Sequence, residues 1–458
     1  MQPNGRRWKV LAVTAVAVFM GFLDVTIVNV AFPDIERDFA SATRADLSWV
    51  LNAYNIVFAA LLVPSGRLAD LLGRRRMFLI GVTAFVAASA LCGVAPGPEW
   101  LVAARVVQAA AGAILVPTSL ALLLPEFPPE RRATAVAIWS ATGAVAAALG
   151  PSLGGVLVDQ LGWRWVFFLN VPIGLAALVP ARRILHESRD PDGVLPDALG
   201  TLLLVAGVGA LALGIVKGSD WGWGSPRVLA ALAAATVLLP AVVVRSARHR
   251  APVIELSLFR ARSFAVANAG MFAFSTAFYA LLLCNVLFLT QVWGYSILKA
   301  GFAVTPGPLM AALTAPLAGR LSDRFGQRVV AAPGALFFAT GCAVFANGMD
   351  AVPAYASHYL VPTMLTGAGV GFSFASWGSA AVAQLPPARF ATGSAVVSCL
   401  RQIGAVLGIA ALVALLDAAP PTDPLSGFTA AWTMMAVSGG VVAGLALALG
   451  RVRTPVAA

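Results

Sequence analysis

The stretch GRLADLLGRR at residues 66–75 recurs as GRLSDRFGQR at residues 319–328, and each copy follows a long apolar run. A second pair of matching segments, PPERRAT at residues 128–134 and PPARFAT at residues 386–392, lies further along the chain. The two pairs have offsets of 253 and 258 residues, so they belong to one duplication. Repeated halves in membrane proteins are typical of transporters that rock around a central site. The repeat therefore predicts two related halves of six spans each.

The composition indicates a membrane protein. Of the 458 residues, 59% are hydrophobic and only 11% are charged, with a mean hydropathy of +0.86, whereas soluble domains carry about 25% charged residues. This excludes a soluble enzyme, a disordered protein and a secreted disulfide scaffold. We predict an all-α polytopic protein in which each span has roughly 20 apolar residues. The fourteen predicted spans are 8–32, 47–66, 77–95, 100–124, 133–158, 165–181, 198–216, 228–244, 264–290, 297–318, 329–348, 353–380, 390–416 and 428–450.

The seventh and eighth spans have no counterpart in the duplication. We therefore predict a six-helix bundle at residues 1–190, an inserted helix pair with its loops at 191–262, and a second six-helix bundle at 263–458. The four cysteines lie singly inside apolar runs without metal-ligand spacing, which favours buried helix residues and no metal or other cofactor.

Basic residues are distributed unevenly between the two predicted sides of the membrane. With the N-terminus inside, 23 of the 31 Lys and Arg fall in inner segments and 6 in outer loops. The net charge of +11 then divides into +14 inside, −4 outside and +1 within the spans. The positive-inside rule predicts that both termini are cytoplasmic. The net charge thus reflects topology and not a nucleic-acid partner. The apolar run from Trp8 to Val30 is longer than the core of a signal peptide, so we predict that it is a first span that is retained.

Several motifs resemble one transporter family. The loop at 66–75 resembles the loop between spans two and three of the major facilitator superfamily. LDVTIVNVAFP at 23–33 and WRWVFFLNVPIG at 163–174 resemble signatures of its fourteen-span drug:proton antiporters. GPSLGG at 150–155 is similar to the antiporter motif, whereas Ala109 and Ala111 replace glycines of the usual span-four motif. The resemblance implies a protein of the bacterial cytoplasmic membrane, with two six-helix bundles plus two extra helices, that exchanges a small organic substrate for protons. A monomer is the default expectation for its oligomeric state.

Two charged residues are candidates for proton coupling. Asp24 is the only acid inside a predicted span, and a carboxylate in the bilayer core is costly and usually functional. We predict that it loads and releases a proton; the alternative is a permanently paired structural carboxylate. The resemblance implies that Arg105 takes part in this coupling, the alternative being a helix-packing anchor. Thr363 is the repeat counterpart of Arg105, so the arginine belongs to one half only.

A third intramembrane charge, Arg401, is expected to line the substrate cavity because it could not face lipid cheaply. Substrate contact and a structural bond between the halves remain equal alternatives for it. We expect the cavity to hold one acid and two arginines, which disfavours dicationic substrates. The other predicted cavity residues are polar groups in spans: Asn29, Tyr54, Gln108 and Gln402.

Charged residues and glycines of the repeated loops are predicted to latch the cytoplasmic side while the transporter faces outward. The glycines allow a tight turn, and the charges contact helix ends. The predicted gate residues are Gly66, Asp70, Gly73, Arg74, Arg75, Gly319, Asp323, Gly326 and Arg328. In the antiporter-like motif, Gly150 and Pro151 predict a kink, and Gly154 and Gly155 predict close helix packing.

These features predict proton-coupled efflux of amphipathic organic compounds, such as antibiotics or natural products, by alternating access. None of the three lysines completes a P-loop, so an ion gradient must drive transport. The alternative function is proton-coupled uptake of a small nutrient, which the antiporter-like motif disfavours. A membrane-embedded enzyme would need clustered His, Asp or Ser in one span, and the sequence has no such cluster.

Overall fold

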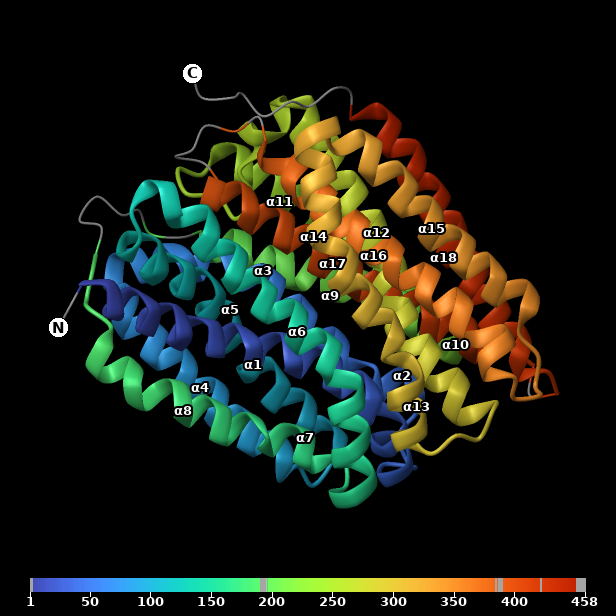
Figure 1. The fold of residues 1–458 in the computed structure, drawn as a ribbon. Helices are drawn as coiled ribbons and strands as arrows, with labels where there is room; N and C mark the ends of the chain where they lie inside the picture. Colours follow the sequence, from blue (N-terminus) through green and yellow to red (C-terminus); the bar gives the residue numbers. More distant parts are fainter. Residues whose placement is uncertain are drawn as a thin grey trace.

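The protein is an array of long helices. The computed structural model describes residues 3–189, 195, 197–383, 385, 390–420 and 422–449, and within these ranges it contains no β-strand. The first half of the chain (blue to green) and the second half (yellow to red) lie side by side as two helical bundles (Figure 1). Twelve helices of the described residues are long and apolar enough to cross a membrane.

The first bundle contains α1 (Pro3–Asp38), α2 (Arg44–Leu47), α3 (Trp49–Leu72), α4 (Arg74–Gly93), α5 (Pro98–Leu123), η1 (Leu124–Glu126), α6 (Pro129–Leu161), α7 (Arg164–Phe168) and α8 (Asn170–Ile184). The inserted segment forms α9 (Ala198–Val216), α10 (Gly218–Trp221), α11 (Pro226–Arg248) and η2 (Leu256–Arg260). The second bundle contains α12 (Arg262–Gln291), α13 (Ile297–Val304), α14 (Pro306–Phe325), α15 (Gln327–Gly348), η3 (Tyr355–Tyr359), α16 (Leu360–Val382), α17 (Phe390–Asp417) and α18 (Pro424–Ala448). Helices cover each of the fourteen predicted stretches, and the count of fourteen membrane crossings stays a prediction.

The repeated loop forms the same turn in both bundles. Gly73 between α3 and α4 has φ 111°, and Gly326 between α14 and α15 has φ 92°. Such positive φ angles strain any residue with a Cβ atom. At Gly73 a Cβ atom would also lie only 2.6 Å from an oxygen of Glu187. The two glycines therefore explain why a helix ends and a new one starts at each position.

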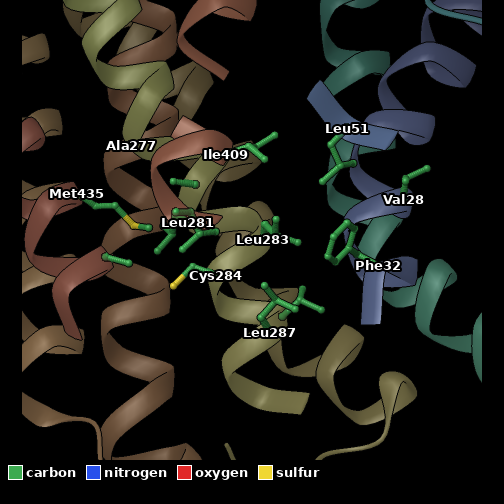
Figure 2. Close-up of a cluster of buried hydrophobic side chains, with 14 of the residues drawn as sticks. Val28, Phe32, Leu51, Ala277, Leu281, Leu283, Cys284, Leu287, Ile409 and Met435 are labelled. Atoms are coloured by element: carbon green, nitrogen blue, oxygen red, sulfur yellow. The ribbon is translucent and has the colours of Figure 1, made fainter. Parts of the chain in front are cut away.

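A large apolar cluster joins the two bundles. Figure 2 shows Val28 and Phe32 of α1 facing Leu283 and Leu287 of α12, with Ile409 of α17 beside them. All five side chains are buried. Because these residues lie toward the ends of α1 and α12 that are predicted to face outward, the halves are closely packed on that side.

The inserted pair touches both bundles. One buried cluster combines Ile56 and Ala60 of α3, Leu204 and Val208 of α9, and Val406 of α17. Helix α9 therefore packs along the seam between the two halves, and α11 packs against α9.

Candidate functional site

Asp24 lies at the centre of a buried polar cluster in the first bundle. Its Oδ2 accepts a hydrogen bond from Nη1 of Arg105 at 2.5 Å. Its Oδ1 accepts from Nε2 of Gln108 at 2.8 Å and from Nδ2 of Asn170 at 2.9 Å. Asp24 and Arg105 are 0% and 1% exposed. Three donors, one of them the guanidinium of Arg105, match an ionised carboxylate, which is the form this geometry stabilises.

Arg105 is itself held on several sides. Its Nε donates to the backbone oxygen of Val50 at 3.1 Å, and its Nη1 also donates to Oε1 of Gln108 at 2.7 Å. The guanidinium carbon lies 4.0 Å from the ring centroid of Tyr54, close enough for a cation–π interaction. Gln108 additionally donates to the hydroxyl of Ser89 at 2.7 Å. The cluster thus connects α1, α3, α4, α5 and α8.

A cavity of about 580 Å³ lies between the two bundles. Helices α1, α3, α5 and α6 line it from the first half, and α12, α13, α14, α16 and α17 line it from the second. Most of its wall is apolar, with aromatic side chains from both halves: Phe22, Tyr54, Phe58, Trp139, Phe278, Tyr279 and Phe374. From the middle of the helices the cavity extends toward Leu62, Trp139 and Ala375, on the predicted cytoplasmic side.

The predicted cavity residues divide into two groups. Asn29, Tyr54, Arg401 and Gln402 line the cavity, whereas Gln108 does not, because it is bonded to Asp24 inside the first bundle. Asp24 and Arg105 are likewise absent from the lining. The expectation of one acid and two arginines in the cavity is therefore wrong: among the described lining residues, Arg401 is the one charged group.

Helical periodicity explains where Asp24 points. Val18, Phe22, Val25 and Asn29 of α1 line the cavity at spacings of three and four residues. Asp24 is offset by one residue from that face and points into the first bundle. Tyr54 separates the two sites, because its ring lines the cavity and also contacts Arg105.

Gln402 forms a cross-bundle contact beside Arg401. Its Oε1 accepts from the Tyr279 hydroxyl at 3.1 Å, and its Nε2 donates to Oδ1 of Asn55 at 3.2 Å. These bonds fix α17 to α12 in its own half and to α3 in the other. Arg401 itself has its guanidinium carbon 5.8 Å from the Phe22 ring centroid.

The gate residues of the first repeat form local contacts. Nε of Arg74 donates to Oδ1 of Asp70 at 2.8 Å. The carboxylate of Glu187 accepts from the backbone amides of Arg75 and Arg76, both at 3.1 Å, and so caps the start of α4. Nη2 of Arg75 donates to the backbone oxygen of Arg182 at 2.6 Å. The first gate is thus tied to the end of α8 and to the loop that follows it.

The remaining gate residues take less part in described contacts. Gly66 packs near Pro117, whereas a Cβ atom at Gly319 would meet open space. Arg328 is exposed. The side chain of Asp323 lies outside the described part of the structure.

The glycines of the antiporter-like motif sit where helices approach closely. A Cβ atom at Gly150 would lie 2.0 Å from Oγ1 of Thr26, and one at Gly154 would lie 2.7 Å from Ile27. At Gly155 it would lie 3.2 Å from backbone atoms of residues 297 and 298. Pro151 lies inside the continuous helix α6, with its oxygen against Gly301. The motif therefore lets α6 approach α1 and, across the seam, α13.

Polar residues join the two halves at the ends of the helices that are predicted to face outward. Nε of Arg44 donates to Glu36 at 2.9 Å, and its Nη2 donates to Gln291 at 3.1 Å. Nη1 of Arg44 lies 3.7 Å from Oδ1 of Asp417. Gln291 also donates to Glu36 at 3.1 Å. Together with the packing of Gly155 against α13, this network joins the two halves at the ends of the helices that are predicted to face outward.

Comparison with known proteins decides the family. A family model described as Major Facilitator Superfamily matches residues 14–408 and 267–458. The chain belongs to this superfamily. It is 36% identical over 409 residues to the multidrug resistance protein Stp of Mycobacterium tuberculosis, covering 89% of this chain and 75% of Stp. It is 35% identical over 425 residues to a probable actinorhodin transporter of Streptomyces coelicolor, covering 90% of this chain and 72% of that protein.

The superfamily fold is also found in solved structures. A bacterial homologue of the human lysosomal transporter Spinster, in an inward-facing and unoccupied conformation, has a TM-score of 0.67 at 18% identity. The match covers 97% of each chain. As a superfamily member with many apolar helices, the chain is a multi-pass protein of the bacterial cytoplasmic membrane.

Two residues of the site were missed from the sequence. Asn170 appears in the sequence analysis only within the motif at 163–174, and Glu187 is not among the residues predicted there. The signal for Asn170 was an amide inside an apolar stretch, which in a membrane requires a partner. Nothing in the sequence alone pairs Glu187 with the start of α4, because that contact spans 112 residues.

Proposed function

We propose that the chain exports amphipathic organic compounds from the cytoplasm in exchange for protons, with both termini cytoplasmic and fourteen membrane crossings. The observation that carries this proposal is the buried Asp24–Arg105 pair beside a large apolar cavity. The names of the relatives, a multidrug resistance protein and a probable actinorhodin transporter, support drug or antibiotic efflux. A total proton-motive force of about 150 mV supplies roughly 3.5 kcal/mol per proton.

The geometry suggests how proton binding moves the cavity wall. Ionised Asp24 holds α1 to α5 and α8 through Arg105, Gln108 and Asn170. A proton on Asp24 removes its charge and weakens these charge-assisted bonds. Since α1 also carries the cavity face at Phe22 and Asn29, its release couples proton binding to the shape of the substrate site.

The gate residues fit the same cycle. The outer sides are closed in the inward-facing state through Arg44 and Gly155. We propose that the repeated loops at Gly73 and Gly326 close the cytoplasmic side when the outer network opens. The predicted glycine-rich motif around Pro151 would then act at the outer seam.

The test is transport by purified protein in vesicles whose interior is acidic. An antiporter accumulates an aromatic compound there in exchange for outgoing protons, whereas the alternative, an uptake symporter, accumulates it only when the exterior is acidic. We expect Asp24→Asn to abolish gradient-driven accumulation. Asp159→Asn, the same change at an exposed position on α6, serves as the matched control. Unchanged coupled transport by Asp24→Asn would remove Asp24 from the mechanism.

A further inference from the structure

Arg401 is a charged group in the cavity wall that has no charged partner among the residues that the structure describes. Its Nε is buried and has no hydrogen-bond partner in the described part of the structure. None of the ion pairs formed by the described residues includes it. Its one described interaction is the 5.8 Å approach to the ring of Phe22 across the seam. A guanidinium in an apolar pocket is costly without a counter-charge.

None of the described residues supplies that counter-charge. Asp24, the acid inside the spans, is 0% exposed and is already bonded to Arg105 and two amides. Tyr54 lies between the polar cluster around Asp24 and the cavity. The neighbour of Arg401, Gln402, is fixed by bonds to Tyr279 and Asn55, so this part of α17 is held in place and keeps Arg401 at the cavity.

The surrounding wall favours flat aromatic groups. Phe22 reaches the cavity from α1, and Phe278 and Phe374 reach it from α12 and α16. Phe278 and Phe374 pack edge to face, with ring centroids 5.1 Å apart. Aromatic side chains interact favourably with other rings, and a volume of about 580 Å³ lies in the range of sites for drug-sized molecules.

We infer that this transporter selects aromatic compounds that carry one anionic group, a carboxylate or phenolate, which binds the guanidinium of Arg401 while the rings lie between the aromatic side chains. This inference rests on the proposed function and names its substrate class. The planar guanidinium forms two parallel hydrogen bonds with a carboxylate, which an ammonium group cannot reproduce. A dication, by contrast, would meet a like charge and no acid among the described lining residues.

The test compares two nearly isosteric probes, anthracene-9-carboxylate and anthracene-9-carboxamide, by equilibrium binding to purified protein at neutral pH. We expect wild type to bind the carboxylate about tenfold more tightly than the carboxamide, a difference of about 1.4 kcal/mol. Arg401→Gln should remove this preference while leaving carboxamide binding nearly unchanged. Arg401→Lys should retain part of it. Arg248→Gln, the same change at an exposed position on α11, should keep it fully.

Either of two results would overturn the inference: no preference for the carboxylate in wild type, or an undiminished preference in Arg401→Gln. Wild type alone decides the first, so the test holds even if the variant fails to fold. Because binding is measured without a gradient, this outcome is separate from the proposed function. If the protein binds with the expected preference but shows no proton-driven transport, the proposed function is refuted and the inferred binding site is retained.

Discussion

At the residue scale, Asp24 and Arg105 form a pair whose members depend on each other. Asp24 accepts three hydrogen bonds, and Arg105 donates to Asp24, Gln108 and the backbone of Val50. In a buried site, removal of one partner leaves an uncompensated charge, whereas removal of both does not. The pair therefore has consequences for stability that differ between single and double substitutions.

We expect Arg105→Gln to lower the free energy of unfolding by about 3–5 kcal/mol, because it leaves the Asp24 carboxylate buried without its cation. The double variant Arg105→Gln with Asp24→Asn should recover a large part of this loss. Thermal unfolding of the detergent-solubilised protein measures the order of the variants. If Arg105→Gln were as stable as wild type, another group would have to compensate the buried charge of Asp24.

Tyr54 separates the polar cluster around Asp24 from the cavity, and this role can be tested by changing the size of the side chain at position 54. We expect Tyr54→Ala to open a path between the two and to raise proton leak through vesicles in the absence of substrate. Tyr54→Phe should behave like wild type, because the hydroxyl has no hydrogen-bond partner among the described residues. A pH-sensitive dye inside the vesicles reports the leak, and equal leak in all three proteins would refute this barrier.

Part of this site could be predicted from the sequence. Asp24 and Arg105 stand out because charges are rare in apolar helices, and Arg401 stands out for the same reason. The division of these charges between two sites was not predicted from the sequence. The spacing of Phe22, Val25 and Asn29 nevertheless indicates one face of α1, and Asp24 is not on that face. The partner Asn170 depends on how α8 packs on α1, which no local pattern specifies.

At the element scale, close contacts between helices control the outer seam. Gly155 brings α6 against the backbone of α13, and Arg44 joins the outer ends of both halves. The inserted pair adds a contact through Lys217, whose Nζ lies 2.7 Å from Oδ1 of Asp46. Burial alone would lower the pKa of Lys217, but hydrogen bonds with Asp46 and Asp220 outweigh it and raise the pKa. This cation therefore remains charged at neutral pH.

We expect Gly155→Ala to shift the protein toward the outward-open conformation, because the added Cβ atom would lie 3.2 Å from rigid backbone of α13. Spin labels at the exposed outer positions 160 and 352 would report a longer distance in the variant. Gly440→Ala on α18 is the control, since its Cβ atom would meet nothing within 4 Å. An unchanged distance distribution would contradict this prediction, because it would mean that α6 and α13 accommodate the added methyl group without opening the outer side.

At the scale of the whole molecule, the repeat predicts two bundles but not what lies between them. The turns at Gly73 and Gly326 are repeated because only glycine adopts their backbone angles easily. The position of α9 against α3 and α17 could not be derived, because the insertion has no counterpart in the repeat. The charge of the cavity depends on how all the helices are packed, because the face that each helix turns toward the seam decides which charged side chains line the cavity.

That charge leads to a prediction about the membrane potential. If one proton enters for each monoanion that leaves, two positive charges move inward per cycle, whereas a neutral substrate moves one. An interior-negative potential contributes about 2.3 kcal/mol per charge per 100 mV, so it should drive anthracene-9-carboxylate out with roughly twice the free energy available for the carboxamide. A potassium gradient with valinomycin sets the potential in loaded vesicles at equal pH on both sides. Equal responses of the two probes would contradict export of the anion.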